Sequence, residues 1–426
     1  MKKVPKRRFK GFLNAGDWEQ RKLGEIFEYL QNNTLSRDSL NYKNPNVKNI
    51  HYGDILVKFD EILDGSNKDI PYINSEVDLS KFSKSLLRDG DIIFSDTAED
   101  DTVGKAIELQ NVNAPFILSG LHTIPCRPLI PFGKGYLGNF LNSDSYRLQL
   151  RPLVQGIKVS SISKSALKDT MIEYPKNLDE QEKIGSLFYY IAKMITLHQR
   201  KLEKLQATKK ALLYELFPIE NSRRPKLRFK GFTGDWEQRK LGELLEQPIT
   251  DGPHETPELY DSGIPFISVD AIIDNKIDFT KMRGCISKEY DDICAKKYKP
   301  QINDVYLVKS GATIGKVAIV DTYDDFNIWS PLAAMRCGSI TNPYFLYVLL
   351  QTKDLQTQVF NKASHGTQPN LSMRQLETFA CKVPKIEEQI LISRFFKRLN
   401  DSITLHQRKL EKLKNLKAAY LNEMFV

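Results

Sequence analysis

The sequence predicts a mixed α/β (α+β) protein with two similar globular domains, two long antiparallel coiled-coil helices between them, and a pseudo-two-fold internal repeat. Three observations predict this fold. Long segments occur twice, short β-rich runs fill the stretches between the repeated segments, and each half ends in a long run of helical periodicity.

Two segments are repeated without change. GDWEQRKLGE occupies residues 16–25 and 234–243, and ITLHQRKLEKL occupies 195–205 and 403–413. Between these segments the two halves diverge and keep only a common skeleton. Identical ends with divergent middles indicate a shared mechanical role for the ends and different recognition by the middles.

The middles have the pattern of short strands. GDIIF, PFILSG and LHTIPC in the first half, and PFISV, DVYLV and KVAIV in the second, alternate with Gly, Pro and Asp turns. Such β-rich runs between turn residues predict a mixed α/β or α+β domain in each half.

The ends of the halves have the pattern of a coiled coil. From Ile184 to Leu216, and again from Ile392 to Met424, the seam positions recur in alternating steps of four and three. A helix of about 38 residues is about 57 Å long, enough to hold two domains apart. In a chain with two-fold pseudo-symmetry the two helices run antiparallel, with one domain near each end.

Local signals mark the ends of the first helix. No proline interrupts residues 182–217, and Pro218 follows at once. Asp179 with Glu182 resembles a capping box at the start. His198 and His406 occupy equivalent seam positions, and we favour a polar residue that sets the register over a pH-sensitive or metal-linked pair.

Composition bounds the class of protein. Of the 426 residues 41% are hydrophobic and 27% charged, which is the balance of a globular chain, and the length suggests two or three domains. The formal charge of +9 is compatible with a nucleic-acid partner. Five scattered cysteines without a C-x-x-C pair argue against disulfides or zinc. Neither a signal peptide nor a membrane span is predicted, so we expect a cytoplasmic protein.

Further motifs carry a family resemblance. They are LRFKGFTGDWEQRKLGEL before the second domain, DGPHETP (251–257), SGATIGKVAI (310–319), HGTQPNLS (365–372) and the E-x-Q-I/L helix starts. Together they resemble the specificity subunit of type I restriction-modification systems over essentially the whole chain.

The resemblance implies a function. Each variable domain would be a target recognition domain that reads one half of a split site in double-stranded DNA. The conserved helices would set the unread spacer and bind two modification subunits, which methylate adenine with S-adenosylmethionine. Restriction (motor-nuclease) subunits would complete the complex. The chain itself would be a non-catalytic subunit without a cofactor or a bound metal.

The domain limits follow from the repeats and the resemblance. We expect the first target recognition domain, with its basic lead, at 1–177, and the first conserved helix at 178–218. The second target recognition domain is expected at 219–383, and the second helix at 384–426.

Loop residues with hydrogen-bond donors are the candidates for DNA contact. Gln368 and Asn370 are the foremost, since amide side chains pair bidentately with adenine. The first half has an acidic loop (96–101) where the second has KSGATIGK, which argues against a close phosphate contact and allows hydrogen bonds from cytosine amino groups. The full set is Lys105, Lys158, Ser160, Ser161, Lys164, His254, Lys309, Ser310, Lys316, Gln368, Asn370 and Arg374.

Four strings resemble catalytic or nucleotide-binding motifs. NPYF (342–345) is explained by a helix cap followed by proline, and GKGYLG (133–138) by a loop that leads into a helix. GATIGKV (311–317) is one residue short of a P-loop, and we interpret the carboxylates at 96–101 as a solvated loop rather than a metal site. None of the four predicts an enzyme.

Two other function classes remain. A self-contained modification or cleavage enzyme would need a methyltransferase domain that this chain has no room for. A coiled-coil adaptor that does not bind DNA is the alternative, and salt-dependent DNA binding would separate it from a specificity subunit.

Overall fold

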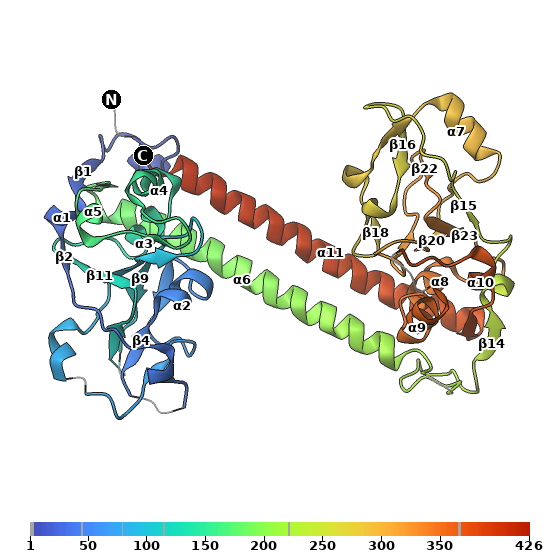
Figure 1. Cartoon of the computed structure of the whole chain (residues 1–426), viewed down its shortest axis with the longest axis horizontal. Coiled ribbons are helices and arrows are strands. Elements are labelled where there is room, and N and C mark those ends of the chain that lie inside the picture. Colours follow the sequence, from blue (N-terminus) through green and yellow to red (C-terminus); the bar gives the residue numbers. More distant parts are fainter. Residues whose placement is uncertain (1–3, 44–45, 79, 114–115, 220–221, 365–367) are drawn as a thin grey trace. The chain divides into compact units, whose positions relative to one another are not determined.

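The computed structural model describes residues 4–43, 46–78, 80–113, 116–219, 222–364 and 368–426. Its contacts divide the chain into unit 1, Met1–Gln199 with Arg408–Val426, and unit 2, Arg200–Gln407. Both boundaries fall inside long helices. Each unit therefore contains the beginning of one long helix and the end of the other (Figure 1).

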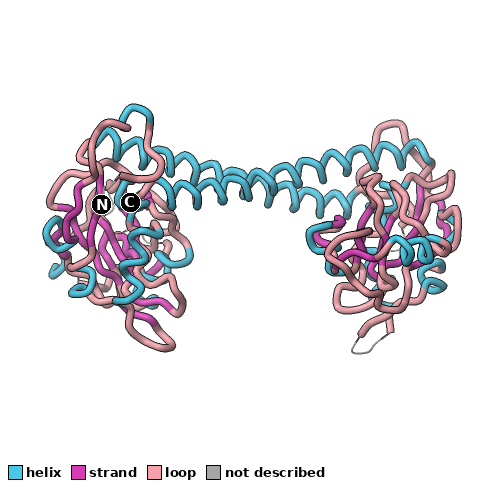
Figure 2. The backbone as a smooth tube through the Cα atoms, turned by 90° about the horizontal axis from the view of Figure 1, so that it is seen from above, coloured by secondary structure: helices cyan, strands magenta, loops and turns pink. Residues whose placement is uncertain are grey.

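The two long helices are α6 (Leu178–Glu215) and α11 (Ile386–Glu423), and each has 38 residues. Figure 2 shows both as uninterrupted helices. The chain follows α6 from unit 1 into unit 2 and α11 from unit 2 into unit 1, so the helices run in opposite directions between the units. The predicted seam positions of both helices are all buried or half-buried, which confirms the periodicity.

The start of α6 differs from the prediction. The side-chain oxygen of Asn177 accepts hydrogen bonds from the backbone N–H groups of Asp179 (2.8 Å) and Glu180 (3.4 Å). The cap is therefore Asn177 and not Asp179. The helix begins earlier than the capping-box pattern indicated, because an asparagine oxygen already satisfies its first free donors.

Unit 1 has two larger sheets and two small ones in its described residues. The central sheet has the order β2-β11-β7-β9-β5, and a second has the order β10-β4-β6-β3. Its strands are β1 (Glu19–Lys22), β2 (Phe27–Tyr29), β3 (Leu40–Asn41), β4 (Lys48–Ile50), β5 (Ile62–Asp64), β6 (Tyr72–Ile73), β7 (Ile92–Ser95), β8 (Thr97–Ala98), β9 (Ala106–Gln110), β10 (Ile117–Ser119), β11 (Thr123–Pro128), β12 (Ser160–Ser161) and β13 (Met171–Tyr174). Its short helices are α1 (Leu23–Ile26), α2 (Tyr52–Val57), α3 (Tyr136–Phe140), α4 (Asp144–Leu150) and α5 (Lys164–Lys168).

Unit 2 repeats this plan. The order of its central sheet is β15-β23-β20-β21, and the described residues also form a sheet of order β19-β16-β22. Its strands are β14 (Glu237–Lys240), β15 (Thr250–Asp251), β16 (Ile264–Ile267), β17 (Ile272–Ile273), β18 (Lys276–Ile277), β19 (Gly284–Ile286), β20 (Val305–Val308), β21 (Val317–Ile319), β22 (Asn327–Ile328), β23 (Leu332–Met335) and β24 (Ala380–Val383). Its other helices are α7 (Lys288–Ala295), α8 (Pro343–Leu349), α9 (Lys353–Lys362) and α10 (Met373–Glu377).

The common skeleton of the two units is a central three-strand arrangement. In unit 1, β7 pairs antiparallel with β9 and β11, and in unit 2, β20 pairs antiparallel with β21 and β23. Both middle strands are buried along their whole length, which explains their runs of apolar residues. The mixed α/β prediction and the internal repeat are confirmed.

The repeated basic segments are held by buried ion pairs. Arg8 makes two hydrogen bonds to Glu180 of α6 (2.6 and 2.8 Å), and Arg228 makes two to Glu388 of α11 (both 2.8 Å). Both glutamates are fully buried or nearly so. A bidentate guanidinium–carboxylate pair fixes orientation as well as distance. This explains why the two arginines and the two glutamates recur.

The repeated tryptophans receive the end of a long helix. In unit 1, Phe425, just after α11, lies against Trp18 with ring centroids 6.4 Å apart, and stacks on Phe188 of α6 at 5.7 Å. In unit 2, Phe217, just after α6, has the same relation to Trp236 at 5.7 Å. Each GDW segment therefore closes the core of its unit around the end of the helix that arrives from the other unit.

Two features concern the predictions on disulfides and membrane spans. The five cysteines are unpaired, and four of them are buried. None of the helices in the described part of the chain combines the length and the apolar character that a membrane crossing requires.

Candidate nucleic-acid interface

Two loops of unit 2 join beside the central strand β20. Ser310 and Asn370 form an isolated antiparallel bridge, and the Gly311 N–H donates to the Pro369 carbonyl (2.9 Å). The Leu371 N–H donates to the Lys309 carbonyl (2.9 Å). The structure thus brings together Lys309, Ser310 and Asn370, with exposed Gln368 next in the same loop. His365, Gly366 and Thr367 of the HGTQPNLS motif lie outside the described residues.

Asp251, the first residue of the DGPHETP run, contacts Lys309 of the joined loops. One oxygen of this fully buried carboxylate lies 3.3 Å from the Lys309 ammonium and 3.2 Å from Nε2 of His254, and the other contacts Lys297. Two ammonium groups and a histidine surround one carboxylate, so positive charge prevails here. Lys309 is buried, whereas His254 is exposed at the rim. Lys309 therefore supports the site, and His254 is the side chain available to a ligand.

Trp329 completes this edge of unit 2 and was not among the predicted residues. The Arg283 guanidinium lies 4.3 Å from the centre of its ring, and the next residue, Ser330, donates its N–H to the Pro253 carbonyl (3.2 Å). A Cβ at Gly252 would lie 1.8 Å from the Ile328 carbonyl oxygen, so only glycine fits against the backbone at Ile328 and Trp329. The glycine of DGPHETP was a sequence signal for a close approach of two backbone segments. The segment that it approaches, β22, is too distant in the sequence to be identified from the sequence alone.

Unit 1 builds the same loop pair with different chemistry. Ser160 and Ser161 pair with β8, and the Ile162 N–H donates to the Asp96 carbonyl (2.8 Å), as Leu371 does to Lys309. Asp96 and Lys309 therefore occupy equivalent positions, one residue after the middle strand. A carboxylate stands in unit 1 where unit 2 has an ammonium.

The acidic loop of unit 1 is largely held by its own hydrogen bonds. Asp96 accepts from the Thr97 hydroxyl (2.8 Å) and lies 3.3 Å from Nδ1 of His122. Asp100 accepts from the Thr102 N–H (2.9 Å) and hydroxyl. No group of three or more His, Cys, Asp or Glu side chains in the part of the chain described here has the arrangement of a metal site.

A rigid turn in unit 1 projects an apolar side chain that sequence analysis missed. Gly156 has φ +115°, and a Cβ there would lie 2.0 Å from the Val159 carbonyl oxygen. The turn is closed by reciprocal backbone hydrogen bonds between Gln155 and Ser161 (2.9 and 2.7 Å). Ile157 at its tip is fully exposed, next to the exposed Lys158. The turn therefore holds an apolar side chain in solvent beside a basic one.

Two predicted lysines have internal partners. The Lys105 ammonium donates to the carbonyls of Phe59 (2.8 Å) and Leu56 (3.3 Å), and its burial lowers its pKa. Lys316, its counterpart in unit 2, donates to the Ile272 carbonyl (3.1 Å). Both connect the central loop to the neighbouring segment rather than pointing outward.

The remaining predicted residues lie on short helices beside the loops. Lys164 is exposed at the start of α5, with its ammonium 5.9 Å from the centre of the Tyr29 ring. Arg374 is exposed on α10, where Ser372 forms a capping box with Gln375. Lys164 follows Ile162 by two residues and Arg374 follows Leu371 by three, so both stand just after the joined loops in the sequence.

The family model for the type I restriction modification DNA specificity domain matches residues 15–207 and 233–415. The chain belongs to this family. A relative named for the MjaX type I restriction enzyme specificity subunit of Methanocaldococcus jannaschii is 23% identical over 95% of this chain and 92% of its own length. The EcoBI specificity subunit of Escherichia coli is 25% identical over 57% of this chain and 54% of its own.

A solved structure gives the same fold. The type I restriction-modification S subunit from M. genitalium superposes with a TM-score of 0.63 over 99% of both chains, at 13% identity. The two matched segments of the family model coincide with the two halves of the repeat.

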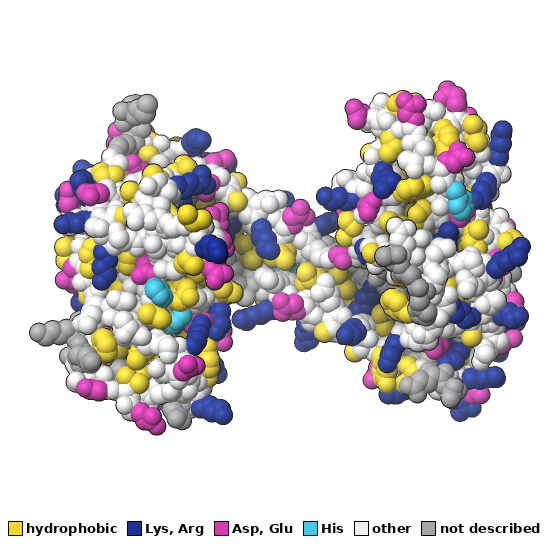
Figure 3. All heavy atoms as spheres, viewed as in Figure 1, with side chains coloured by type: hydrophobic (Ala, Val, Ile, Leu, Met, Phe, Trp, Pro, Cys, Tyr) yellow, Lys and Arg dark blue, Asp and Glu magenta, His cyan; other side chains and the backbone are white. Residues whose placement is uncertain are grey.

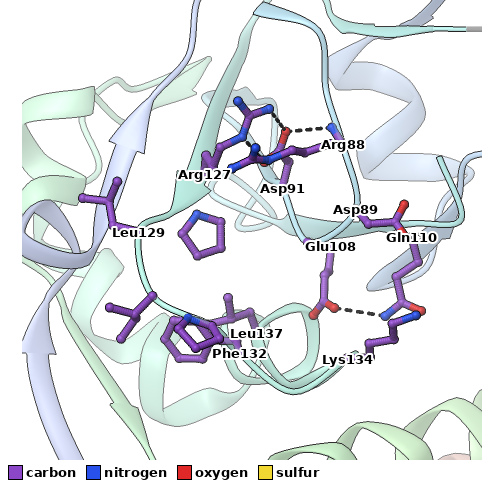
Figure 4. A pocket seen from close by; sticks show the side chains of 14 residues that line it. Arg88, Asp89, Asp91, Glu108, Gln110, Arg127, Leu129, Phe132, Lys134 and Leu137 are labelled. Carbon is purple, nitrogen blue, oxygen red and sulfur yellow. Dashed lines mark hydrogen bonds and ion pairs between the residues drawn. The ribbon is translucent and has the colours of Figure 1, made fainter. Parts of the chain in front are cut away.

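Two motifs of this specificity-family chain that resembled other sites have structural roles. The buried carboxylate of Glu108 accepts the N–H groups of Gly135 (2.6 Å) and Gly138 (2.9 Å), so the GKGYLG loop uses its donors internally. Figure 4 shows this carboxylate with the Gln110 amide that also donates to it (3.0 Å). Burial raises the pKa of Glu108. In NPYF, the Asn342 side chain accepts the Phe345 N–H (3.1 Å) and caps α8, with proline following at once, as predicted.

Charge is not concentrated in a single patch on the face shown in Figure 3, where Lys and Arg side chains are spread among Asp and Glu over both units. On this face, a basic patch therefore does not mark an interface. The joined loops of each unit are the better-defined candidate.

Proposed function

We propose that the chain is the DNA-reading specificity subunit of a type I restriction-modification complex that acts in the cytoplasm. Residues 1–177 and 219–383 form target recognition domains that each read one half of a bipartite site in double-stranded DNA. The helical segments 178–218 and 384–426 set the spacer and dock two modification subunits, and restriction subunits join the full complex. The chain supplies recognition and no chemistry of its own.

One observation carries this proposal. The same pair of joined loops occurs in both units, and its chemistry is opposite, with Asp96 in unit 1 where unit 2 has Lys309. A coiled-coil adaptor would not need two copies of one loop scaffold with different polar groups. A protein that reads two half-sites of different sequence would need such a pair, because base edges differ in their hydrogen-bond donors and acceptors.

The residues in the two domains have different expected roles. In the second domain, Gln368 and Asn370 read bases, with Ser310, His254 and Arg374 beside them. Lys309 and Lys316 position the loops. These exposed amides suit adenine, which accepts and donates on the same major-groove edge.

In the first domain, Lys158, Ser160 and Ser161 surround Ile157 at the rigid turn, and Lys164 lies beside them on α5. Lys105 positions the loop from below. An exposed isoleucine suits the methyl group of thymine or a wedge between base pairs. Asp96 accepts hydrogen bonds, as an amino group of cytosine would require.

Selection of bound sequences from a random double-stranded library tests the proposal. We expect the intact chain to enrich a bipartite motif, with affinity that falls steeply as salt rises. Asn370→Ala should relax one base position of one half-site and cost about 1–3 kcal/mol there. Asn361→Ala, an equally exposed asparagine on α9, is the matched control and should change nothing.

The contrary results are specific. Absence of DNA binding at any salt concentration would favour the adaptor, and DNA binding without sequence preference would contradict the reading of a bipartite site. A uniform loss of affinity for all sequences in Asn370→Ala would make that residue a backbone contact rather than a base reader.

A further inference from the structure

Unit 2 has a cavity of about 290 Å³ between α6, α11 and the β17–β18 hairpin, which we call the lysine pocket. Three lysines line it: Lys209 and Lys210 from α6, and Lys276 from the hairpin. Its one lining carboxylate is Asp274, which accepts a hydrogen bond from Gln407 of α11 (3.2 Å). The charged groups that line this pocket therefore sum to net positive.

Lys209 has an uncharged partner. Its ammonium donates to the amide oxygen of Gln351 (3.0 Å), and no carboxylate among the described residues lies within ion-pair distance of it. Burial and the nearby charge of Lys276 lower the pKa of Lys209 to about 8, and the carboxylate of Asp274 only partly opposes this shift. The protonated, charged form of Lys209 is thus disfavoured. An anion in the pocket would favour that form and raise the pKa of Lys209 again.

The repeat provides an internal comparison. Lys417 stands at the same position of the repeated helix, four residues after the ITLHQRKLEKL segment, and lies in unit 1. Both oxygens of Glu61 are 2.8 Å from its ammonium. Unit 1 therefore supplies a carboxylate for the seam lysine, whereas unit 2 supplies the neutral Gln351.

The lysine pocket is also connected to the candidate interface. The Asn275 side chain donates to Gln351 (3.3 Å) and accepts the N–H of Val317 (3.2 Å), the first residue of β21. Val317 directly follows Lys316 at the end of the central loop. A ligand in the pocket would therefore contact the segment that positions the loop.

We propose that the lysine pocket binds a phosphate group beside Lys209, whose hydrogen-bond partner Gln351 is uncharged, with Lys210 and Lys276 in the same lining. The Lys276 ammonium also contacts the Thr404 hydroxyl. Lysines surrounding a cavity with amide donors suit a tetrahedral oxyanion, since each ammonium offers three donors. The phosphate belongs either to the DNA backbone next to the half-site, which rests on the proposed function, or to free phosphate in solution.

The first experiment uses inorganic phosphate and the full chain. At constant ionic strength, replacing chloride with phosphate should raise the melting temperature of the wild type, and calorimetry should show one site. Lys209→Met should lower phosphate affinity at least about tenfold, the loss expected for removing one charged partner. Lys204→Met, an exposed lysine on the same helix, is the matched control and should bind as the wild type does.

A second variant tests the internal comparison. Gln351→Glu places a carboxylate beside Lys209, as Glu61 stands beside Lys417 in unit 1. We expect this variant to melt at a higher temperature without phosphate and to lose the phosphate effect. Because this variant is expected to gain stability, loss of binding cannot be attributed to misfolding. Equal phosphate stabilisation of the wild type, Lys209→Met and Gln351→Glu would overturn the proposal.

A DNA-binding experiment distinguishes the two sources of the phosphate group. If the phosphate is that of DNA, Lys209→Met should reduce the slope of log affinity against log salt by about 0.9, one phosphate contact. An unchanged slope with intact phosphate binding assigns the site to free phosphate. Phosphate binding by a chain that binds no DNA would support the pocket while contradicting the proposed function.

Discussion

The end of α11 is the place where a single substitution tests the architecture most simply. Phe425 is 3% exposed although it is the penultimate residue, and its ring lies 5.7 Å from those of Tyr136, Phe140 and Phe188. Phe425→Ala removes an aromatic side chain from this core. Such truncations cost about 3–5 kcal/mol, against about 5–15 kcal/mol for the stability of a whole domain. For a unit of this size we expect a fall in Tm of roughly 6–20 °C.

Guanidinium unfolding followed by tryptophan fluorescence measures this loss. In a background with Trp236→Phe and Trp329→Phe, Trp18 is the single tryptophan and reports unit 1 alone. Leu416→Ala, an exposed leucine on the same helix, is the control and should change stability by less than about 0.5 kcal/mol. Equal, small effects of Phe425→Ala and Leu416→Ala would show that the chain end does not close the core of unit 1.

Three further outcomes are expected. Glu180→Gln leaves the buried Arg8 guanidinium without a counter-charge and should cost about 3–5 kcal/mol in chemical denaturation, whereas Glu19→Gln in the exposed pair with Arg21 should cost less than about 1 kcal/mol. Because the folded pKa of Lys209 is about 8 and its ordinary value is 10.5, the folded state binds fewer protons in that window. Stability should therefore rise by up to about 3 kcal/mol between those pH values in the wild type and not in Lys209→Met. A heptad inserted after Leu205 lengthens α6 by about 10 Å in phase, and methylation mapping with the modification subunit should show a spacer longer by roughly one to three base pairs.

Each of these has a contrary result. Equal losses in the two glutamate variants would make the buried pair energetically unimportant. A parallel rise in stability with pH in Lys209→Met would assign that rise to other groups. An unchanged spacer with full activity in the insertion variant would show that the helices do not set the distance between half-sites.

The sequence predicted the parts of the fold that local pattern determines. The seam from Ile184 to Leu216 predicted α6, and the repeated β-rich runs predicted the central strands, because periodicity and turn residues are properties of neighbouring positions. The cap at Asn177 was missed, since a capping box two residues later also fitted the pattern. Local alternatives of this kind differ by about 1 kcal/mol and are poorly separated by sequence alone.

What the sequence could not predict depends on contacts between distant residues. The repetition of Trp18 and Trp236 was evident, but not that each receives the end of a helix from the other half of the repeat. The candidate residues differ in the same way. Ser310 and Asn370 were proposed separately and lie together, whereas Lys105 and Lys316 were chosen for their charge and bind carbonyls that only the fold brings near.

Ile157 was missed for a different reason. Apolar residues in a loop are expected to be buried, and nothing nearby in the sequence indicates that Gly156 and its turn keep the isoleucine in solvent. An exposed apolar side chain at a binding surface is recognised only once its surroundings are known.

The central claim is that the two domains read DNA independently, and exchange of one domain tests it most directly. Residues 26–177 would be replaced by the equivalent segment of another family member, with both repeated ends left unchanged. The methylated adenines would then be mapped in DNA from cells that also express the cognate modification subunit. The account predicts that one half-site changes while the other half-site and the spacer are kept. A change in both half-sites, or in neither, would contradict it.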